Sequence, residues 1–241
     1  MRLAYQNTTL LSTIIIRGHN SLDTTKRRAI LALRDVDALQ REIEKGIEIL
    51  RGAGVVAFPT DTVYGLGADA FNSMAVERVY AVKRRPSDRQ FPLLIADMRR
   101  LTDLADPIPE IAWFLARRFW PGGLTLVLRK RDSLDTSAAS GATIAVRVPH
   151  HPVCQALIKG LGNPLVGTSA NISGRPPALT AGEVQQQLGR KVDLIIDGGK
   201  SPGGKESTVV NVTDDKPVIL REGIIPSPEI DAAYKEYLEV K

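Results

Sequence analysis

The order of helix and strand signals in this sequence predicts an α/β fold, built as a single domain on a mixed sheet. From residue 35 onward, roughly seven or more apolar strand-like segments are interleaved with four or five amphipathic segments in mixed order. The 241 residues are 43% hydrophobic and 24% charged, which suits one core of ordinary size, and no internal repeat is present. We therefore expect one domain over residues 35–225, preceded by an N-terminal extension over 1–34 and followed by a C-terminal tail over 226–241.

The helices are predicted from apolar residues at spacings of three and four. The first begins at a cap on Asp35 or Asp37 and ends at Gly52 and Gly54. Further helices are expected from Asn72 or Ser73 to Lys83, from near Asp106-Pro107 to Pro121, from Pro152 to Leu161, and from a capping box at Thr180 and Glu183 to Leu188.

Short apolar runs predict the strands. They are Gly54–Phe58, Leu93–Ile95, Leu124–Leu128, Thr143–Val148, a segment ending at Val166-Gly167, Leu194–Ile196, Thr208–Val212 and Val218–Leu220. Open α/β sheets place ligands at strand ends, so polar residues there are site candidates. These candidates are Thr60 to Thr62, Thr143, Arg147, Ser169, Asn171, Ser207 and Arg221.

Two short stretches indicate anion binding. Lys83-Arg84-Arg85-Pro86 follows a predicted helix, and Thr168-Ser169-Ala170-Asn171 follows a predicted strand. Together they offer cations, hydroxyls and an amide, which can hold a phosphate chain without a Walker loop. The structural alternative for Lys83 and Arg85 is compensation of the helix macrodipole at its C-terminus.

Arg147 is the most unusual single residue, because it lies inside the apolar strand Thr143–Val148. A buried arginine requires a carboxylate or phosphate partner, whereas an arginine on an edge strand can face water. The distribution of charge along the rest of the sequence gives less information about the site. Six basic and two acidic residues within positions 1–35 account for most of the net charge of +5.

Several other site classes are excluded. Gly199 to Lys205 has the spacing of a P-loop, but Glu206 replaces the metal-binding Ser/Thr and a strand follows instead of a helix. The single cysteine, Cys154, lies in a predicted helix as a small hydrophobe, and it argues for a reducing, cytoplasmic location. The apolar run Leu10–Ile16 is too short to span a membrane, so no membrane partner is expected.

Over about residues 36–225 the sequence resembles the YrdC family of threonylcarbamoyl-AMP synthases. The segments that carry the resemblance are Phe58-Pro59-Thr60-Asp61-Thr62-Val63-Tyr64-Gly65-Leu66, Lys83-x-Arg85-Pro86, Trp120-Pro121-Gly122-Gly123-Leu124-Thr125, Val146-Arg147-Val148-Pro149, Thr168-Ser169-Ala170-Asn171-x-Ser173-Gly174, Ser207-Thr208-Val209-Val210 and Leu220-Arg221-x-Gly223. The resemblance implies an open twisted mixed sheet with flanking helices and a concave basic face.

The reaction that the resemblance implies joins L-threonine, bicarbonate and ATP into L-threonylcarbamoyl-AMP and pyrophosphate, for modification of a tRNA adenosine. This chemistry needs no enzyme nucleophile, because the carbamate of threonine attacks the α-phosphorus itself. Catalysis then depends on holding anionic reactants together and offsetting charge on the phosphorus. Expected partners are ATP, L-threonine, bicarbonate and a downstream tRNA-modifying transferase complex, with contact to tRNA or another RNA.

Transferred position by position, the family pattern implies three groups of site residues. Thr60, Arg147 and Ser207 would bind threonine, with Arg147 clamping its carboxylate. Lys83 and Arg85 would be catalytic and would also bind nucleotide. The nucleotide would further contact Thr143, Ser169, Asn171 and Arg221, and Mg²⁺ would accompany ATP, with no metal site of the protein's own.

The sequence departs from the longer family members in two ways. Ala96 stands where they carry a histidine, and their C-terminal domain is not expected here, which indicates the short single-domain form. Two alternatives remain open. One is an RNA-binding module of YrdC-like fold without catalysis, although few aromatics lie near the basic clusters. The other is a carbamoyl-transfer domain like that of hydrogenase maturation proteins, which are much longer chains.

Overall fold

The computed structural model describes the backbone of residues 24–241 and the side chains from residue 36 onward. Residues 1–38 and residues 39–241 form separate units, and the features discussed below lie in the larger one, apart from the first part of the helix Thr24–Arg51. Most of the predicted extension over 1–34 lies outside the described residues. Within residues 24–241, no helix combines the length and apolar content needed to cross a membrane.

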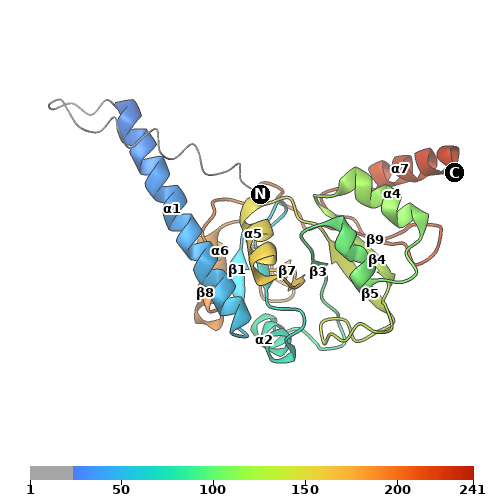
Figure 1. Cartoon of the computed structure of the whole chain (residues 1–241), viewed down its shortest axis with the longest axis horizontal. Coiled ribbons are helices and arrows are strands. Elements are labelled where there is room, and N and C mark those ends of the chain that lie inside the picture. Colours follow the sequence, from blue (N-terminus) through green and yellow to red (C-terminus); the bar gives the residue numbers. More distant parts are fainter. Residues whose placement is uncertain (1–23) are drawn as a thin grey trace, which may run out of the picture. The chain divides into compact units, whose positions relative to one another are not determined.

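Helices and strands alternate along the larger unit (Figure 1). The helices of the described residues are α1 (Thr24–Arg51), α2 (Ser73–Lys83), α3 (Leu101–Leu104), α4 (Glu110–Phe119), α5 (Pro152–Leu161), α6 (Ala181–Gln187) and α7 (Ser227–Val240), with short 3₁₀ helices at Met98–Arg100 and Gly189–Lys191. The strands are β1 (Val56–Phe58), β2 (Gly65–Gly67), β3 (Leu93–Leu94), β4 (Leu124–Arg129), β5 (Thr143–Arg147), β6 (Leu165–Val166), β7 (Thr168–Ser169), β8 (Leu194–Ile195), β9 (Thr208–Asn211) and β10 (Val218–Arg221).

The predicted α/β class with a mixed sheet is confirmed, but the strands divide over two sheets. One has the order β7-β2-β1-β8, with β1 and β8 parallel. The other has the order β10-β9-β4-β5-β3-β6, with β4 parallel to β9 and β3 parallel to β5. The chain passes from the second sheet to the first at Gly167, between β6 and β7. A Cβ at Gly167 would come within 2.4 Å of the Leu94 side chain, so this crossing needs glycine.

The first helix begins earlier than predicted. We expected a start at Asp35 or Asp37, but α1 begins at Thr24 because the residues before Asp35 are mostly good helix formers such as Lys, Arg, Ala and Leu. Its predicted end is confirmed, since the helix stops at Arg51 and the Gly52 amide donates to the Glu48 carbonyl at 3.0 Å. A Cβ on Gly54 would lie 2.7 Å from the Ile49 carbonyl oxygen, which explains the glycine there.

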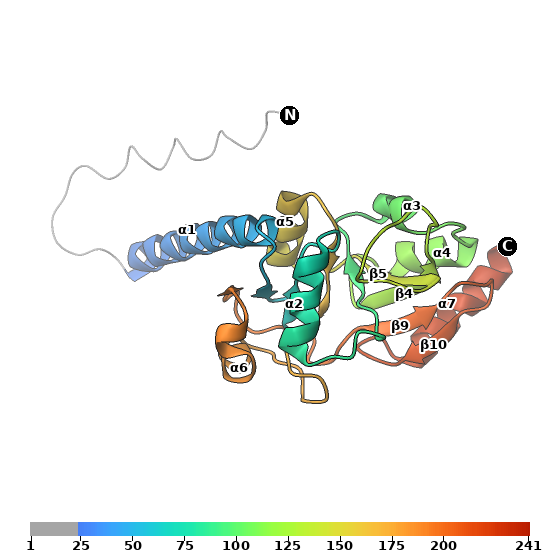
Figure 2. The ribbon, with the colours of Figure 1, turned by 90° about the horizontal axis from the view of Figure 1, so that it is seen from below.

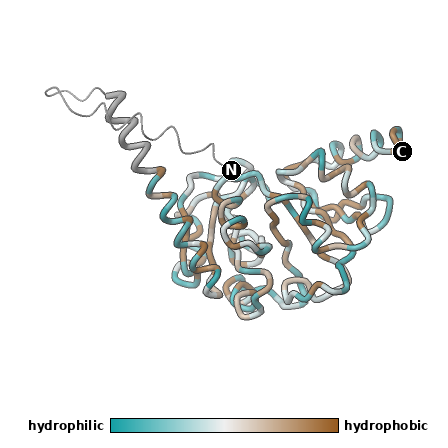
Figure 3. The backbone as a smooth tube through the Cα atoms, viewed as in Figure 1, coloured by the Kyte–Doolittle hydropathy of each residue, from teal (hydrophilic) through white to brown (hydrophobic). Residues whose placement is uncertain are grey.

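Two apolar cores support the sheets. The larger core packs the buried faces of α2, α4 and α7 against both sheets. The smaller core joins Ile43 and Leu50 of α1 to Val153 and Leu157 of α5, beneath Phe58 of β1. The C-terminal half of α1 accordingly lies beside α5 (Figure 2). Strands β3, β4 and β5 are hydrophobic over most of their length (Figure 3).

Residues 226–241, to which the sequence analysis assigns no element, contain α7. This helix lies beside α4 (Figures 1 and 2), with the rings of Phe114 and Tyr237 5.6 Å apart. An exposed ion pair of 2.7 Å joins Arg118 to Glu236 across the same contact. The segment therefore belongs to the packed structure of the larger unit.

Candidate functional site

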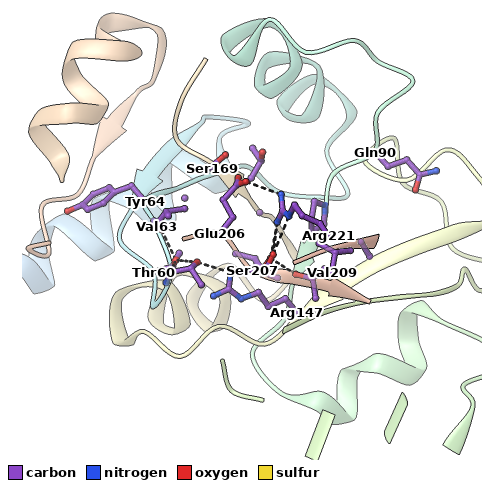
Figure 4. A pocket seen from close by; sticks show the side chains of 18 of the residues that line it. Thr60, Val63, Tyr64, Gln90, Arg147, Ser169, Glu206, Ser207, Val209 and Arg221 are labelled. Atoms are coloured by element: carbon purple, nitrogen blue, oxygen red, sulfur yellow. Dashed lines mark hydrogen bonds and ion pairs between the residues drawn. The ribbon is translucent and has the colours of Figure 1, made fainter. Parts of the chain in front are cut away.

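A pocket of about 260 Å³ opens among the ends of strands from both sheets (Figure 4). Its wall combines apolar residues such as Leu94 and Val209 with a large set of polar side chains. The polar residues that line it are Thr60, Thr62, Tyr64, Arg85, Gln90, Thr125, Arg147, Thr168, Ser169, Glu206, Ser207 and Arg221. Of the residues to which the family pattern assigns a role, six meet in this pocket: Thr60, Arg85, Arg147, Ser169, Ser207 and Arg221.

The hydroxyl of Thr60 is already committed within the protein. It donates to the Val63 carbonyl at 2.6 Å and accepts from the Thr62 amide at 3.1 Å. The Thr62 hydroxyl lies 2.9 Å away and completes its hydrogen bonding. Thr60 therefore holds the loop between β1 and β2 in shape.

Arg147 is buried, as expected for an arginine with an acidic partner. Its Nη2 lies 2.7 Å from Asp61 Oδ1, in an ion pair whose side chains are only 8% and 14% exposed. The same guanidinium donates to Thr62 Oγ1 at 3.0 Å and to the Gly122 carbonyl at 2.9 Å. Three of its five N–H groups are thereby used, and the other two have no partner among the described residues. The edge-strand alternative is wrong, since β5 lies between β4 and β3.

Arg85 and Arg221 also line the pocket and come from different segments of the chain. Arg85 donates to the carbonyls of Arg89 and Gln90, and its guanidinium lies 5.1 Å from the centre of the Phe91 ring. Burial lowers the pKa of Arg85. Arg221 donates to Glu206 Oε2 at 3.0 Å and to the Ser207 carbonyl at 2.9 Å.

Lys83 does not line the pocket but supports a strand that does. Its side chain is almost wholly buried, and its ammonium donates to the Ser169 carbonyl, to the Asn171 carbonyl at 2.9 Å and to Asn171 Oδ1 at 3.2 Å. Burial is the main reason that the pKa of Lys83 falls to about 8, and the nearby Arg85 lowers it further. The ammonium bonds to residues more than eighty positions away instead of the carbonyls at the end of α2, so helix-end compensation is not its main role.

Asn171 and Thr143 also lie outside the pocket lining. The Asn171 amide accepts from Lys83 and donates to the Arg175 carbonyl at 2.5 Å, so both of its polar ends are used. Thr143 shares a face of β5 with Ala145 and Arg147, which do line the pocket, but it lies at the far end of that strand.

The structure adds Glu206 and Thr125, which sequence reasoning did not nominate for the site, and it shows the partner of Asp61, which was a candidate within Thr60 to Thr62. Glu206 lines the pocket beside Arg221, and the Thr125 hydroxyl lies 2.8 Å from Ser207 Oγ. Asp61 anchors Arg147 from behind and also accepts the His150 amide at 2.9 Å. Asp61 stood in the polar Thr60-Asp61-Thr62 elbow, a signal that could have paired it with Arg147. In the sequence analysis, Glu206 was considered only as the residue that replaces the metal-binding Ser/Thr of a P-loop.

The basic and hydroxyl side chains of the pocket suit polyanions. Among residues 36–241, no group of three or more His, Cys, Asp or Glu side chains could hold a metal ion. Cys154 is buried in α5, and desolvation raises the pKa of its thiol, which fits its expected role as a core residue and not a nucleophile.

Comparison with known proteins shows to which family the chain belongs. The family model for Sua5, YciO and YrdC, described as "Telomere recombination", matches residues 48–223. A threonylcarbamoyl-AMP synthase of Bacillus subtilis is 44% identical over 210 residues, which are 86% of this chain and 61% of that protein. A putative threonylcarbamoyl-AMP synthase of Mycobacterium tuberculosis is 37% identical over 81% of this chain and 90% of its own length.

The fold has a counterpart among solved structures. The crystal structure of P. abyssi Sua5 complexed with L-threonine superimposes with a TM-score of 0.75 at 43% identity. The match covers 79% of this chain and 56% of that one. The chain thus spans somewhat more than half the length of the Bacillus and P. abyssi proteins.

Proposed function

Because the chain belongs to the Sua5/YciO/YrdC family, we propose that it is an L-threonylcarbamoyladenylate synthase. It would convert L-threonine, bicarbonate and ATP into L-threonylcarbamoyl-AMP and pyrophosphate. Relatives that carry the name threonylcarbamoyl-AMP synthase, and a family structure complexed with L-threonine, support this assignment.

One observation carries the proposal. Arg85, Arg147 and Arg221 come from three separate segments and line a single pocket together with the hydroxyls of Ser169 and Ser207. Charge-assisted hydrogen bonds from such groups are the strong ones for phosphate and carboxylate. The substrates are a triphosphate, an amino acid and bicarbonate, and a pocket of this composition can hold all three close together.

We assign the two ends of the pocket to different substrates. Arg85, Ser169 and Arg221 would bind the phosphates of ATP, and Lys83 would act on them through the Ser169–Asn171 segment that it holds. Ser207 and the two unused N–H groups of Arg147 would bind threonine, with the carboxylate on Arg147. Thr60 and Asp61 would keep that arginine in place.

The reaction requires charge stabilisation more than covalent chemistry. A carbamate oxygen attacks the α-phosphorus, the bond from that phosphorus to the bridging oxygen breaks, and pyrophosphate leaves. Arginine donors around the phosphates would offset the charge that develops in the transition state. Mg²⁺ would come with ATP and neutralise part of the phosphate charge.

The product would be consumed by a transferase that acts on a tRNA adenosine, and the cytoplasmic location expected from the sequence stays a prediction. The test is mass spectrometry of the products from purified protein with ATP, L-threonine and bicarbonate, omitting each substrate in turn. We expect threonylcarbamoyl-AMP and pyrophosphate only with all three present. No product, together with RNA affinity that falls steeply with salt, would instead support the RNA-binding module.

A further inference from the structure

Glu206 has no role in the function proposed so far, although its position in the pocket is unusual. Among the described residues it is the only carboxylate that lines the pocket. Its side chain is 37% exposed, and Oε2 accepts from Arg221 at 3.0 Å, while no described residue donates a hydrogen bond to Oε1. Figure 4 shows it beside Arg221, in the part of the pocket between Ser169 and Ser207.

A carboxylate at this point works against the binding of anions. Glu206 lies close enough to Arg85 and Lys83 to act on the charge of both, so it weakens the positive field that the phosphates would meet. An arginine pocket that held only phosphate and carboxylate groups would bind them more tightly without Glu206. Its presence therefore calls for a ligand group that is positive or that must give up a proton.

The amino-acid substrate supplies such a group. Its amine is an ammonium at neutral pH, yet only the neutral amine can form a bond to carbon dioxide. Arg221 connects Glu206 to the proposed threonine end of the pocket, because its Nη2 also lies 3.3 Å from Ser207 Oγ. A substrate held by Ser207 and Arg147 would thus have its nitrogen within the reach of the neighbouring residue, Glu206.

We propose that the Glu206 carboxylate binds the ammonium of the amino-acid substrate and acts as the general base that deprotonates it. This inference rests on the proposed synthase function. One N–H bond breaks, its electron pair stays on nitrogen, and the proton moves to Oε1 of Glu206. Glu206 then gives that proton to the hydroxyl of bicarbonate, whose C–O bond breaks to release water and carbon dioxide. The amine nitrogen bonds to the carbon, and its next proton leaves to solvent as the carbamate forms.

The experiment compares Glu206→Gln with the wild type and with Glu236→Gln. The glutamine keeps the size and one oxygen acceptor but cannot hold a positive charge or take a proton. Glu236 is a matched control, because it is also a partly exposed glutamate in an ion pair with an arginine, Arg118, but it lies on α7 away from the pocket. Its exposed pair contributes little to stability.

Two measurements separate the base role from a structural one. The first is the pyrophosphate release rate at saturating L-threonine, which should fall by about 100-fold or more in Glu206→Gln and stay at the wild-type value in Glu236→Gln. The second is the calorimetric affinity for L-threonine against 3-hydroxybutanoate, which is threonine without its amine. Glu206→Gln should bind threonine about 10-fold more weakly and 3-hydroxybutanoate as well as the wild type.

Three results would overturn the inference. The first is turnover of Glu206→Gln within threefold of the wild type. The second is an equal loss of its affinity for L-threonine and for 3-hydroxybutanoate. The third is a fall in its Mg-ATP affinity with threonine binding unchanged. An equal loss would mean that Glu206 only holds Arg221 in place, and a selective loss of Mg-ATP would make it a metal ligand. Failure of the synthase proposal itself is recognised separately, since the wild type would then form no threonylcarbamoyl-AMP at all.

Discussion

Replacing Lys83 by methionine tests whether a buried ammonium holds one wall of the pocket. Methionine keeps most of the side-chain volume but removes the donor that joins α2 to the Ser169 and Asn171 carbonyls and to the Asn171 amide. The Ser169 hydroxyl lines the pocket, so a loosened Ser169–Asn171 segment should cost at least 10-fold in the rate of pyrophosphate release.

The pH dependence of stability follows from the same group. Burial lowers the pKa of Lys83 from 10.5 to about 8. As pH rises, the folded protein loses this proton first, so between about pH 8 and 10.5 the unfolded chain binds more protons and the free energy of unfolding rises. The full rise is about 3 kcal/mol, because each unit of pKa difference corresponds to about 1.4 kcal/mol. Lys83→Met lacks the group and so lacks the rise.

The assay is urea unfolding of both proteins at several pH values from 7.5 to 10. The wild-type value minus the Lys83→Met value should increase by about 2 kcal/mol over this interval, and groups common to both proteins cancel in the difference. A difference that stays flat, or that decreases with pH, would refute the argument that the Lys83 ammonium is buried at an energetic cost.

Three further substitutions test the pocket. Asp61→Asn should lower the free energy of unfolding by about 3–5 kcal/mol, because it leaves Arg147 buried without its charge partner. Asp97→Asn, in an exposed ion pair, should cost much less, and similar urea midpoints for the two variants would contradict this. Arg85→Gln should weaken ATP binding by about 10- to 100-fold in equilibrium titration, and an unchanged affinity would remove Arg85 from the phosphate site. Thr60→Val should destabilise the fold by about 1–3 kcal/mol in urea unfolding, since the Thr62 amide and the Val63 carbonyl lose their partner; an unchanged midpoint would mean that water replaces the hydroxyl.

The elements that the sequence predicted best are those whose boundaries depend on nearby residues. The helix Pro152–Leu161 has the predicted bounds, because proline favours its first position and Gly162 takes the left-handed conformation at its end, with φ 85°. Asn72, one of the two predicted caps of α2, caps the helix by accepting from the Ala75 amide, and Ser73 is the first residue of the helix. The start of α1 was misjudged because Asp35 resembles a cap but lies inside a longer helical stretch.

The division of strands into two sheets could not be foreseen, because strand pairing joins residues far apart in the sequence. β6 and β7 are separated only by Gly167, yet they belong to different sheets. No local pattern distinguishes a strand that continues in one sheet from one that changes sheets. The only sign in the sequence was Gly167 itself, and glycine is needed there because the Leu94 side chain packs against its Cα.

The sequence by itself determined which kinds of residue form the site, namely basic and hydroxyl side chains, and six of those to which the family pattern assigns a role line one pocket. Only the tertiary structure decided which of them are free to bind a ligand. Lys83 donates a hydrogen bond to the side chain of Asn171, and Arg147 forms an ion pair with Asp61. Glu206, in contrast, lines the pocket. The physical reason is that a buried polar group must find a partner, and that partner is chosen by distance in space between segments that the sequence keeps apart.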